Sequence, residues 1–255
     1  MTNTPNAEPN PLNPLASLRG WLAVLLIAVP CMFLVILLPS RAQRRHLARW
    51  AARGTFHMAG IGLRVEGLEN LPQACIVAAN HASYLDGIIL TAALPPRFGF
   101  VIKREITKVP IVGWMLQRLG SEFVDRFDKD AARSDASRIV KRANEGSCLG
   151  VFPEGTFVAE PGLRAFHLGG FMAATRGSLP VVPIAIRGAR RILPAHVWAP
   201  RRGDLEVQVL PAIAPTARNG DAARKLRDDV RAAVLAHCGE PDHAGAVLDQ
   251  KVVSA

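Results

Sequence analysis

The sequence has few aromatic residues and few cysteines, and both shortages disfavour classes of site. Phe, Trp and Tyr make up 6% of the 255 residues, with a single tyrosine. Proteins that bind single-stranded nucleic acids stack bases on aromatic rings, so this composition disfavours such a protein. The four cysteines are scattered, without a C-x-x-C pair or any spacing typical of a metal site. We therefore expect no metal, and reduced core thiols at Cys75 and Cys148, which lie in apolar runs.

Acidic residues are also in deficit, with 21 Asp and Glu against 31 Lys and Arg, which gives a net charge of +10. Such an excess favours an anionic partner: nucleic acid, an anionic lipid surface or a phosphorylated substrate. We rank nucleic acid last, because the basic residues concentrate beside an N-terminal apolar stretch and around the predicted site. The length and an apolar content of 49% suit one globular domain with a short appendage.

The N-terminal region divides into a polar tail and an uncharged stretch. Residues 1–18 are rich in Pro and Asn without periodicity, which predicts a flexible tail. No charged residue occurs over the 18 positions from Trp21 to Leu38, although Pro30 interrupts them. As a helix this stretch would be about 27 Å long, close to the roughly 30 Å of a hydrocarbon core. It fits one tilted span or two short helices that re-enter one leaflet, and a buried soluble helix is the alternative.

Five arginines follow this stretch with no acid between them: Arg41, Arg44, Arg45, Arg49 and Arg53. Their spacing places most of them along one side of a helix. A basic helix beside an apolar segment is attracted to anionic headgroups, by about 1 kcal/mol per cation near the surface. The positive charge also predicts that the chain after residue 40 stays cytoplasmic. We therefore expect a membrane-anchoring helical segment over residues 19–58, with a solvated helix face as the alternative.

From residue 59 to 240 the chain alternates strand-like apolar runs with amphipathic segments. The predicted strands are 63–66, 76–79, 98–103, 121–124, 148–152, 181–187 and 205–210. The predicted helices are 85–93, 109–119, 131–145, 169–176 and 221–237. This alternation predicts an α/β domain with a mostly parallel central sheet flanked by helices, followed by a C-terminal tail at 241–255. In such sheets, ligands bind at the carboxyl ends of the strands.

One such strand end carries His81, five residues before Asp86. On one regular helix these residues would lie about 140° apart, so they can meet only if His81 precedes a helix that begins near Asp86. A neutral imidazole can accept a proton from an alcohol near pH 7, and a carboxylate on its other nitrogen fixes the tautomer. Asn80 suits the turn before the helix. Because no serine or cysteine is clearly placed as a nucleophile, we expect His81 to activate a substrate hydroxyl.

Polar clusters also follow two other predicted strands. Arg126 offers a planar fork of donors to a phosphate or carboxylate, and a surface ion pair is its alternative role. The sequence from Pro153 to Thr156 makes a rigid turn whose backbone N–H groups could approach a ligand, with a purely structural turn as the alternative. We expect these clusters and His81 to converge on one crevice. Pro183, inside an apolar run, predicts an edge strand or the end of strand pairing.

These clusters, in this order and spacing, resemble the lysophospholipid acyltransferase family over about Leu63 to Pro215. The matching segments are Asn80-His81 to Asp86, Lys103-Arg104-Glu105 to Pro110-Ile111-Val112-Gly113-Trp114, Gly120 to Arg126, Phe152-Pro153-Glu154-Gly155-Thr156 and Val182-Pro183-Ile184-Ala185. The resemblance implies transfer of a fatty acyl group from acyl-CoA or acyl-ACP to the hydroxyl of a lysolipid, most simply 1-acyl-glycerol-3-phosphate to give phosphatidic acid. It also implies a membrane location, which we place on the cytoplasmic face of the bacterial inner membrane.

The same resemblance implies roles for individual residues. His81 would be the general base and Asp86 the residue that holds its imidazole. The substrate-binding residues would be Asn80, Lys103, Arg126, Glu154, Gly155 and Thr156. No cofactor or metal is expected, because a thioester is already activated, and backbone N–H groups near the turn would stabilise the oxyanion.

Two positions depart from the family pattern. Phe157 and Val158 stand where Arg or Ser is common after Glu-Gly-Thr, and His167 stands where Lys is common. Both changes remove polarity or fixed positive charge near the expected headgroup site, although Arg164 could substitute. Another lysolipid, including a phosphorus-free one such as a lyso-ornithine lipid, therefore stays open as the acceptor. A membrane lipid-binding protein without catalysis is the alternative of a different class.

Overall fold

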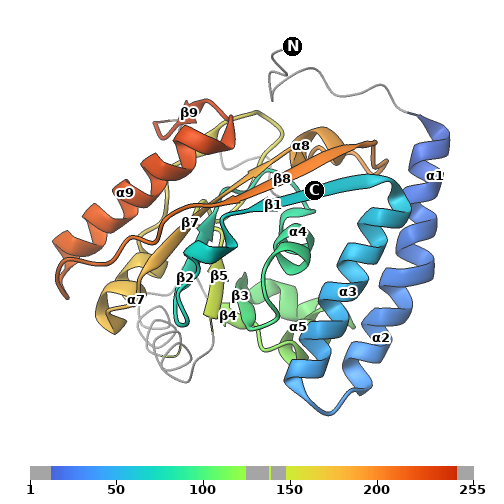
Figure 1. The fold of residues 1–255 in the computed structure, drawn as a ribbon, viewed down its shortest axis with the longest axis horizontal. Coiled ribbons are helices and arrows are strands. Elements are labelled where there is room, and N and C mark those ends of the chain that lie inside the picture. The colour runs from blue at the N-terminus through green and yellow to red at the C-terminus, as the bar shows by residue number, and fades with distance from the viewer. Residues whose placement is uncertain (1–12, 125–137, 139–147, 246–255) are drawn as a thin grey trace.

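The computed structural model describes residues 13–124, 138 and 148–245, and its centre is a seven-stranded sheet (Figure 1). The strand order is β1-β8-β7-β2-β5-β3-β4. These strands are β1 (Ile61–Glu66), β2 (Ile76–Ala79), β3 (Phe98–Lys103), β4 (Glu122–Val124), β5 (Cys148–Val151), β7 (Val181–Arg187) and β8 (Gly203–Val209). Each neighbouring pair is parallel except β7 with β8. The predicted mostly parallel α/β sheet is confirmed.

Helices cover both faces of this sheet, as Figure 1 shows. They are α1 (Pro14–Ala23), α2 (Val29–Leu37), α3 (Arg41–Ala59), α4 (Asp86–Ala93), α5 (Val112–Arg118), α7 (Gly169–Gly177), α8 (Ala189–Ile192) and α9 (Gly220–Cys238). Side chains of β2 alternate between two cores, because successive residues of a strand point to opposite faces. Val77 joins the core that contains Leu90 of α4, and Ile76 joins the core that contains Phe171 of α7.

The first helix begins within the predicted tail. The Asn13 side chain accepts hydrogen bonds from the backbone N–H groups of Leu15 and Ala16, and Pro14 occupies the first helical position. Asn at the N-cap and Pro at the next position are favourable helix starts. The predicted tail boundary at residue 18 is therefore wrong for residues 14–18, which are helical.

Residues Pro14–Leu37 form one helix, and an 18-residue stretch of it has a mean hydropathy of 2.7 and is 28% buried. Pro30 does not divide it, because a π-helical segment, Val24–Ala28, precedes the proline. In the segment the N–H of Val29 bonds to the carbonyl of Val24, a wider turn than in an α-helix. The expected alternative of two short re-entrant helices within residues 21–38 is thus not what forms. The chain instead turns after Leu37, and α3 packs antiparallel along this helix (Figure 1).

Arg44 and Arg45 of α3 are buried against the protein, and the prediction that this row faces lipid headgroups is wrong for these two. Arg44 donates to the carbonyl oxygens of Leu38, Pro39 and Arg118, and Arg45 donates to those of Leu119 and Arg97. Arg53 donates to the carbonyl oxygen of Ala92 in α4. A guanidinium carries five donors, so it can satisfy several chain-end carbonyls where helices and loops meet.

Pro183 lies in β7, an interior strand, where it pairs with Ala78 of β2, so the edge reading is wrong. The end-of-pairing reading holds only toward β8, whose register with β7 ends at the next residue, Ile184. Arg126 lies outside the described residues, and so does the predicted helix 131–145 apart from Arg138, which is helical. The tail predicted from residue 241 is partly structured, because β9 (Asp242–His243) pairs with β6 (Leu163–Arg164). The four cysteines are free and buried, as expected for Cys75 and Cys148.

Candidate active site

The site begins where β2 ends at the carboxyl edge of the sheet. The next residue, Asn80, is 2% exposed and its side-chain amide exchanges two hydrogen bonds with the backbone of Ile186 in β7. The amide thus extends the β2–β7 pairing by one residue and fixes the start of the following turn. The structure gives Asn80 a positioning contact, and its contact with substrate stays a prediction.

His81 and Asp86 meet as predicted. His81 Nδ1 lies 2.8 Å from Asp86 Oδ2, at the first residue of α4. The same oxygen accepts the backbone N–H groups of Ala82 at 2.7 Å and Ser83 at 2.9 Å. Asp86 is fully buried, whereas the His81 side chain is 20% exposed. With Nδ1 directed at a carboxylate, Nε2 is the nitrogen that can accept a proton from an alcohol.

The turn after β5 supports His81 from the other side. Glu154 is buried, and one carboxylate oxygen accepts the N–H of His81 at 2.6 Å while the other accepts the N–H of Arg164 at 2.9 Å. Burial raises the pKa of Glu154 to about 7, although the two N–H donors act to lower it. Glu154 therefore holds two loops together. The predicted contact of Glu154 with the acceptor stays a prediction.

Aromatic rings surround the imidazole. The ring of His81 stacks on that of Phe152, with the ring centroids 4.5 Å apart. The ring of Phe157 packs edge-on against His81, with the centroids 4.7 Å apart. Phe157 also packs edge-on against Tyr84, with the ring centroids 4.7 Å apart, and Tyr84 stacks on Trp198 with the centroids 6.1 Å apart. These rings fix the imidazole plane and make the mouth of the site apolar, which suits a lipid more than a charged headgroup.

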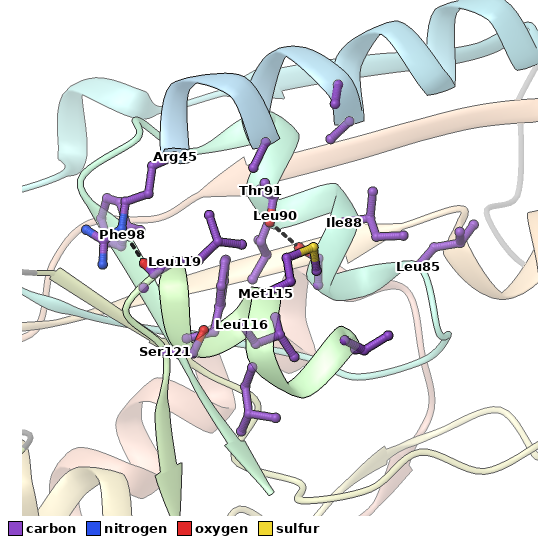
Figure 2. A pocket seen from close by; sticks show the side chains of 18 of the residues that line it. Arg45, Leu85, Ile88, Leu90, Thr91, Phe98, Met115, Leu116, Leu119 and Ser121 are labelled. Carbon is purple, nitrogen blue, oxygen red and sulfur yellow. Dashed lines mark hydrogen bonds between the residues drawn. The ribbon is translucent and has the colours of Figure 1, made fainter. Parts of the chain in front are cut away.

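A cavity of about 760 Å³ opens from this mouth into the protein. His81, Gly155 and Phe157 are among its lining residues, and the π-helical segment, α2 and α3 cover it on one side. Figure 2 shows the inner part, where Ile88 of α4 and Met115 of α5 point into the space and Arg45 lies beside it. The lining is mostly aliphatic and aromatic, so the cavity can hold an alkyl chain whose end lies beside the imidazole.

The other described residues that we predicted to bind substrate are Gly155, Thr156 and Lys103. Gly155 has φ +81°, which favours glycine, and donates its N–H to the Phe152 carbonyl oxygen, so the turn is tight. Thr156 follows it and is partly exposed. Lys103, at the end of β3, pairs with Glu105 at 3.3 Å on the surface and also lines the cavity. Within the described ranges, no group of His, Cys, Asp and Glu is arranged to hold a metal ion.

Sequence reasoning missed the support around the pair. Ser83-x-x-Asp86 is a capping-box pattern, and it could have predicted the bond from the Ser83 N–H to Asp86. The bond between Glu154 and His81 joins residues 73 positions apart. No local pattern could have found it, because it depends on β2 and β5 being neighbours in the sheet.

Comparisons with known proteins identify a family. A sequence profile described as Acyltransferase matches residues 62–187. The 1-acyl-sn-glycerol-3-phosphate acyltransferase of Saccharomyces cerevisiae is 30% identical over 84% of this chain and 75% of its own length. A protein of the same description from Pseudomonas aeruginosa is 33% identical over 71% of this chain and 72% of its own length. The lyso-ornithine lipid O-acyltransferase of that bacterium is also 33% identical, over 63% and 60%.

The fold has a solved counterpart as well. The crystal structure of the 1-acyl-sn-glycerophosphate acyltransferase of Thermotoga maritima aligns with a TM-score of 0.68. The alignment covers 86% of this chain and 93% of that one at 23% identity, so it shows a shared fold. With this fold, the profile match and relatives at 30% identity or above over most of their length, the chain belongs to the acyltransferase family that includes the 1-acyl-sn-glycerol-3-phosphate acyltransferases.

Proposed function

We propose that this acyltransferase moves a fatty acyl group from an acyl thioester, acyl-CoA or acyl-ACP, to the free hydroxyl of a lysolipid. The observation that carries the proposal is the imidazole of His81, held by Asp86 at 2.8 Å and placed at the mouth of an apolar cavity. A base at the end of an alkyl-sized cavity is what acylation of a lipid alcohol requires. A lipid-binding protein without catalysis would need the cavity alone.

In the proposed reaction, His81 Nε2 removes the proton of the lysolipid hydroxyl as its oxygen attacks the thioester carbonyl carbon. Asp86 stabilises the imidazolium that results. The tetrahedral intermediate then collapses, the C–S bond breaks, and the thiolate leaving group takes the proton from His81. The Gly155 N–H is occupied by Phe152, so we propose the N–H of Thr156 as the donor of the turn that faces the oxyanion.

The cavity would hold an acyl chain during this reaction. About 760 Å³ of mostly apolar space is in the range of small-molecule sites. The helix Pro14–Leu37, which covers it, exposes a row of apolar side chains outward, among them Leu18, Leu22 and Leu26. We propose that this face inserts into the membrane, on the cytoplasmic side of the bacterial inner membrane, so that lipid substrates reach His81 from the bilayer.

The acceptor has two candidates. The names of the relatives at 30% and 33% identity favour 1-acyl-glycerol-3-phosphate. Phe157 favours a phosphorus-free acceptor such as lyso-ornithine lipid, since its ring occupies the mouth beside His81 where a cation would be expected for a phosphate. A relative named for that second substrate is also 33% identical to this chain. We place 1-acyl-glycerol-3-phosphate first.

The test is to incubate the purified protein in detergent or vesicles with isotope-labelled acyl-CoA or acyl-ACP and a mixed lysolipid panel. The panel contains 1-acyl-glycerol-3-phosphate, lyso-ornithine lipid and other lysophospholipids, and products are identified by mass. The proposal predicts labelled phosphatidic acid as the main product. A labelled ornithine lipid instead would establish the second acceptor. Binding of lysolipids with no acyl transfer to any of them would contradict both.

A further inference from the structure

The loop that carries Phe157 to the imidazole is held by residues from the C-terminal third of the chain. It comprises residues 157–162, between the turn at Gly155 and strand β6. Its first residue, Phe157, contacts the rings of His81 and Tyr84. The backbone N–H of Arg164, just past its end, bonds to Glu154, which in turn accepts the N–H of His81. Any shift of this loop would therefore reach His81 from two directions.

Arg190 and Glu240 hold the two ends of the loop. Arg190 of α8 donates to the carbonyl oxygen of Val158 at 2.6 Å and to that of Ala159 at 2.9 Å. Glu240, two residues after α9, accepts the N–H of Gly162 at 2.5 Å. The two side chains join each other, with Arg190 Nε 3.1 Å from Glu240 Oε1. The pair thus closes a ring of contacts around the loop.

This pair is more than a surface ion pair. The Arg190 and Glu240 side chains are only 17% and 11% exposed, and every bond named above is charge-assisted. Exposed pairs elsewhere on the protein differ from it: Arg187 and Glu206 are 32% and 41% exposed, with a separation of 3.5 Å. Side-chain pairs with little water around them and several backbone partners fix geometry more strongly than exposed pairs do.

Arg231 and strand β9 also make contacts near this loop, but they hold the strand that follows it. Arg231 of α9 donates to the carbonyl oxygens of Leu163 and Arg164, and β9 pairs with β6. These contacts secure the strand after the loop. Between Val158 and Gly162, the side-chain bonds that the structure records come from Arg190 and Glu240.

We propose that Arg190 and Glu240 are positioning residues for the acceptor lysolipid. By holding residues 157–162, they keep Phe157 against His81 and keep the turn at Gly155 and Thr156 in the conformation that receives the acceptor. Neither side chain lines the cavity or contacts His81. They act through the loop. This inference rests on the proposed function, since it assigns the 157–162 loop to the acceptor.

The test compares Glu240→Ala, Glu240→Gln and Arg190→Met in full-length protein, with acylation rates measured against acceptor and donor concentration separately. We expect KM for the acceptor to rise about tenfold in Glu240→Ala and Arg190→Met, with KM for the donor within twofold of wild type. Glu240→Gln retains an oxygen for the Gly162 N–H, so it should recover part of the loss. The matched control is Glu206→Gln, which removes the exposed pair with Arg187 and should change neither KM.

A double variant, Glu240→Ala with Arg190→Met, tests whether the two residues act as one clamp. We expect it to be no more impaired than the worse single variant, because either change opens the same ring of contacts. If the two single changes multiplied in their effect on the acceptor KM, joint action of Arg190 and Glu240 would be contradicted. An acceptor KM within twofold of wild type in a folded Glu240→Ala protein would also contradict the proposal. If the truncating variants do not fold, Glu240→Gln and Arg190→Lys are judged by the same ratio of acceptor to donor KM. Wild-type activity tests the proposed function separately, so failure of the two ideas can be distinguished.

Discussion

At the scale of single residues, the hydrogen bonds of the site leave Nε2 of His81 as the nitrogen that can accept a proton. Asp86 Oδ2 receives Nδ1 of His81 and two backbone N–H groups, so the carboxylate is held by the turn that it stabilises. Glu154 fixes the backbone of His81, and Phe152 fixes the plane of its ring. Every one of these contacts constrains the imidazole, and together they direct Nε2 to the substrate side.

Replacing Asp86 by Asn tests the carboxylate. The amide oxygen of Asn can still accept the N–H groups of Ala82 and Ser83, so we expect the protein to fold. The imidazolium would lose its negative partner, and we expect kcat to fall by about 10²- to 10⁴-fold. Steady-state acylation rates with a thermal unfolding curve check this. A folded Asp86→Asn protein with kcat within threefold of wild type would show that the carboxylate is not needed.

The raised pKa of Glu154 predicts that the free energy of unfolding depends on pH. Burial raises its pKa from 4.5 to about 7, so between these values the folded protein holds more protons than the unfolded chain. The free energy of unfolding therefore falls as pH rises through this window. Glu154→Gln lacks this titration. We expect the free energy of unfolding of wild type minus that of Glu154→Gln to fall by up to about 3 kcal/mol from pH 4.5 to 7, since one pKa unit is about 1.4 kcal/mol.

Urea unfolding of both proteins at several pH values within that window measures this difference directly. Taking the difference cancels the titration of the other groups, which both proteins share. Two curves that run parallel from pH 4.5 to 7 would mean that Glu154 is already ionised in the folded protein at the lower pH.

Residue roles were predictable to different degrees. The spacing of His81 and Asp86 required a helix start near Asp86, and the structure has α4 beginning there. The functions of Asn80 and Glu154 were not predictable, because their partners, Ile186 and Arg164, come from other strands and loops. A buried polar side chain bonds to whatever the topology brings near it, and one sequence does not state the strand order.

At the scale of elements, strands were easier to predict than the N-terminal helices. Strands such as β3 and β7 have the bounds that their apolar runs predicted. Around Pro30 the local rule of a broken helix failed, because a π-helical segment absorbs the proline. In α3 the row of arginines looked like a surface feature. Arg44 and Arg45 instead bond to carbonyls of distant segments, which only the tertiary structure shows.

The cavity between these elements predicts a chain-length preference. Ala48 of α3 lines it, so Ala48→Phe should fill part of the space. We expect kcat/KM to fall about tenfold for the longest acyl chains and little for short ones, because about 0.8 kcal/mol is lost per methylene group no longer buried. Competition between acyl-CoA chain lengths measures this. Ala42→Phe, at an exposed position of the same helix, is the control. Equal effects on all chain lengths would exclude this cavity as the acyl site.

At the scale of the whole molecule, apolar exposure is concentrated on one side. Exposed large apolar residues of the described ranges lie mainly on the helix Pro14–Leu37, with others on α3–α5, in the segments just before α4 and α5, and at Trp198. All four tryptophans are between 48% and 73% exposed. Trp is common at membrane–water interfaces, where its ring has one apolar and one polar environment. Figure 1 places α7 and α9 on the other side of the sheet, away from α1–α3.

A change on this face should weaken vesicle binding. Leu22→Glu with Leu26→Glu places two charges at exposed positions of the helix, so folding should persist. We expect vesicle affinity to fall more than tenfold, since each leucine would lose about 1.5–3 kcal/mol of burial. Flotation with vesicles that contain anionic lipid measures this. Lys225→Glu on α9 changes the net charge by the same two units and should have little effect. Equal loss in both variants would indicate that charge, and not this apolar face, drives binding.

The most direct test of the account is the acyl-transfer rate of His81→Ala, with His46→Ala, an exposed histidine on α3, as the control. We expect His81→Ala to fold with a circular dichroism spectrum like that of wild type and to bind lysolipid still. Its transfer of label from acyl thioester to lysolipid should fall by about 10²- to 10⁴-fold or more, while His46→Ala stays within twofold of wild type. A folded His81→Ala protein that acylates lysolipid at a near-normal rate would contradict the central claim that this imidazole is the base.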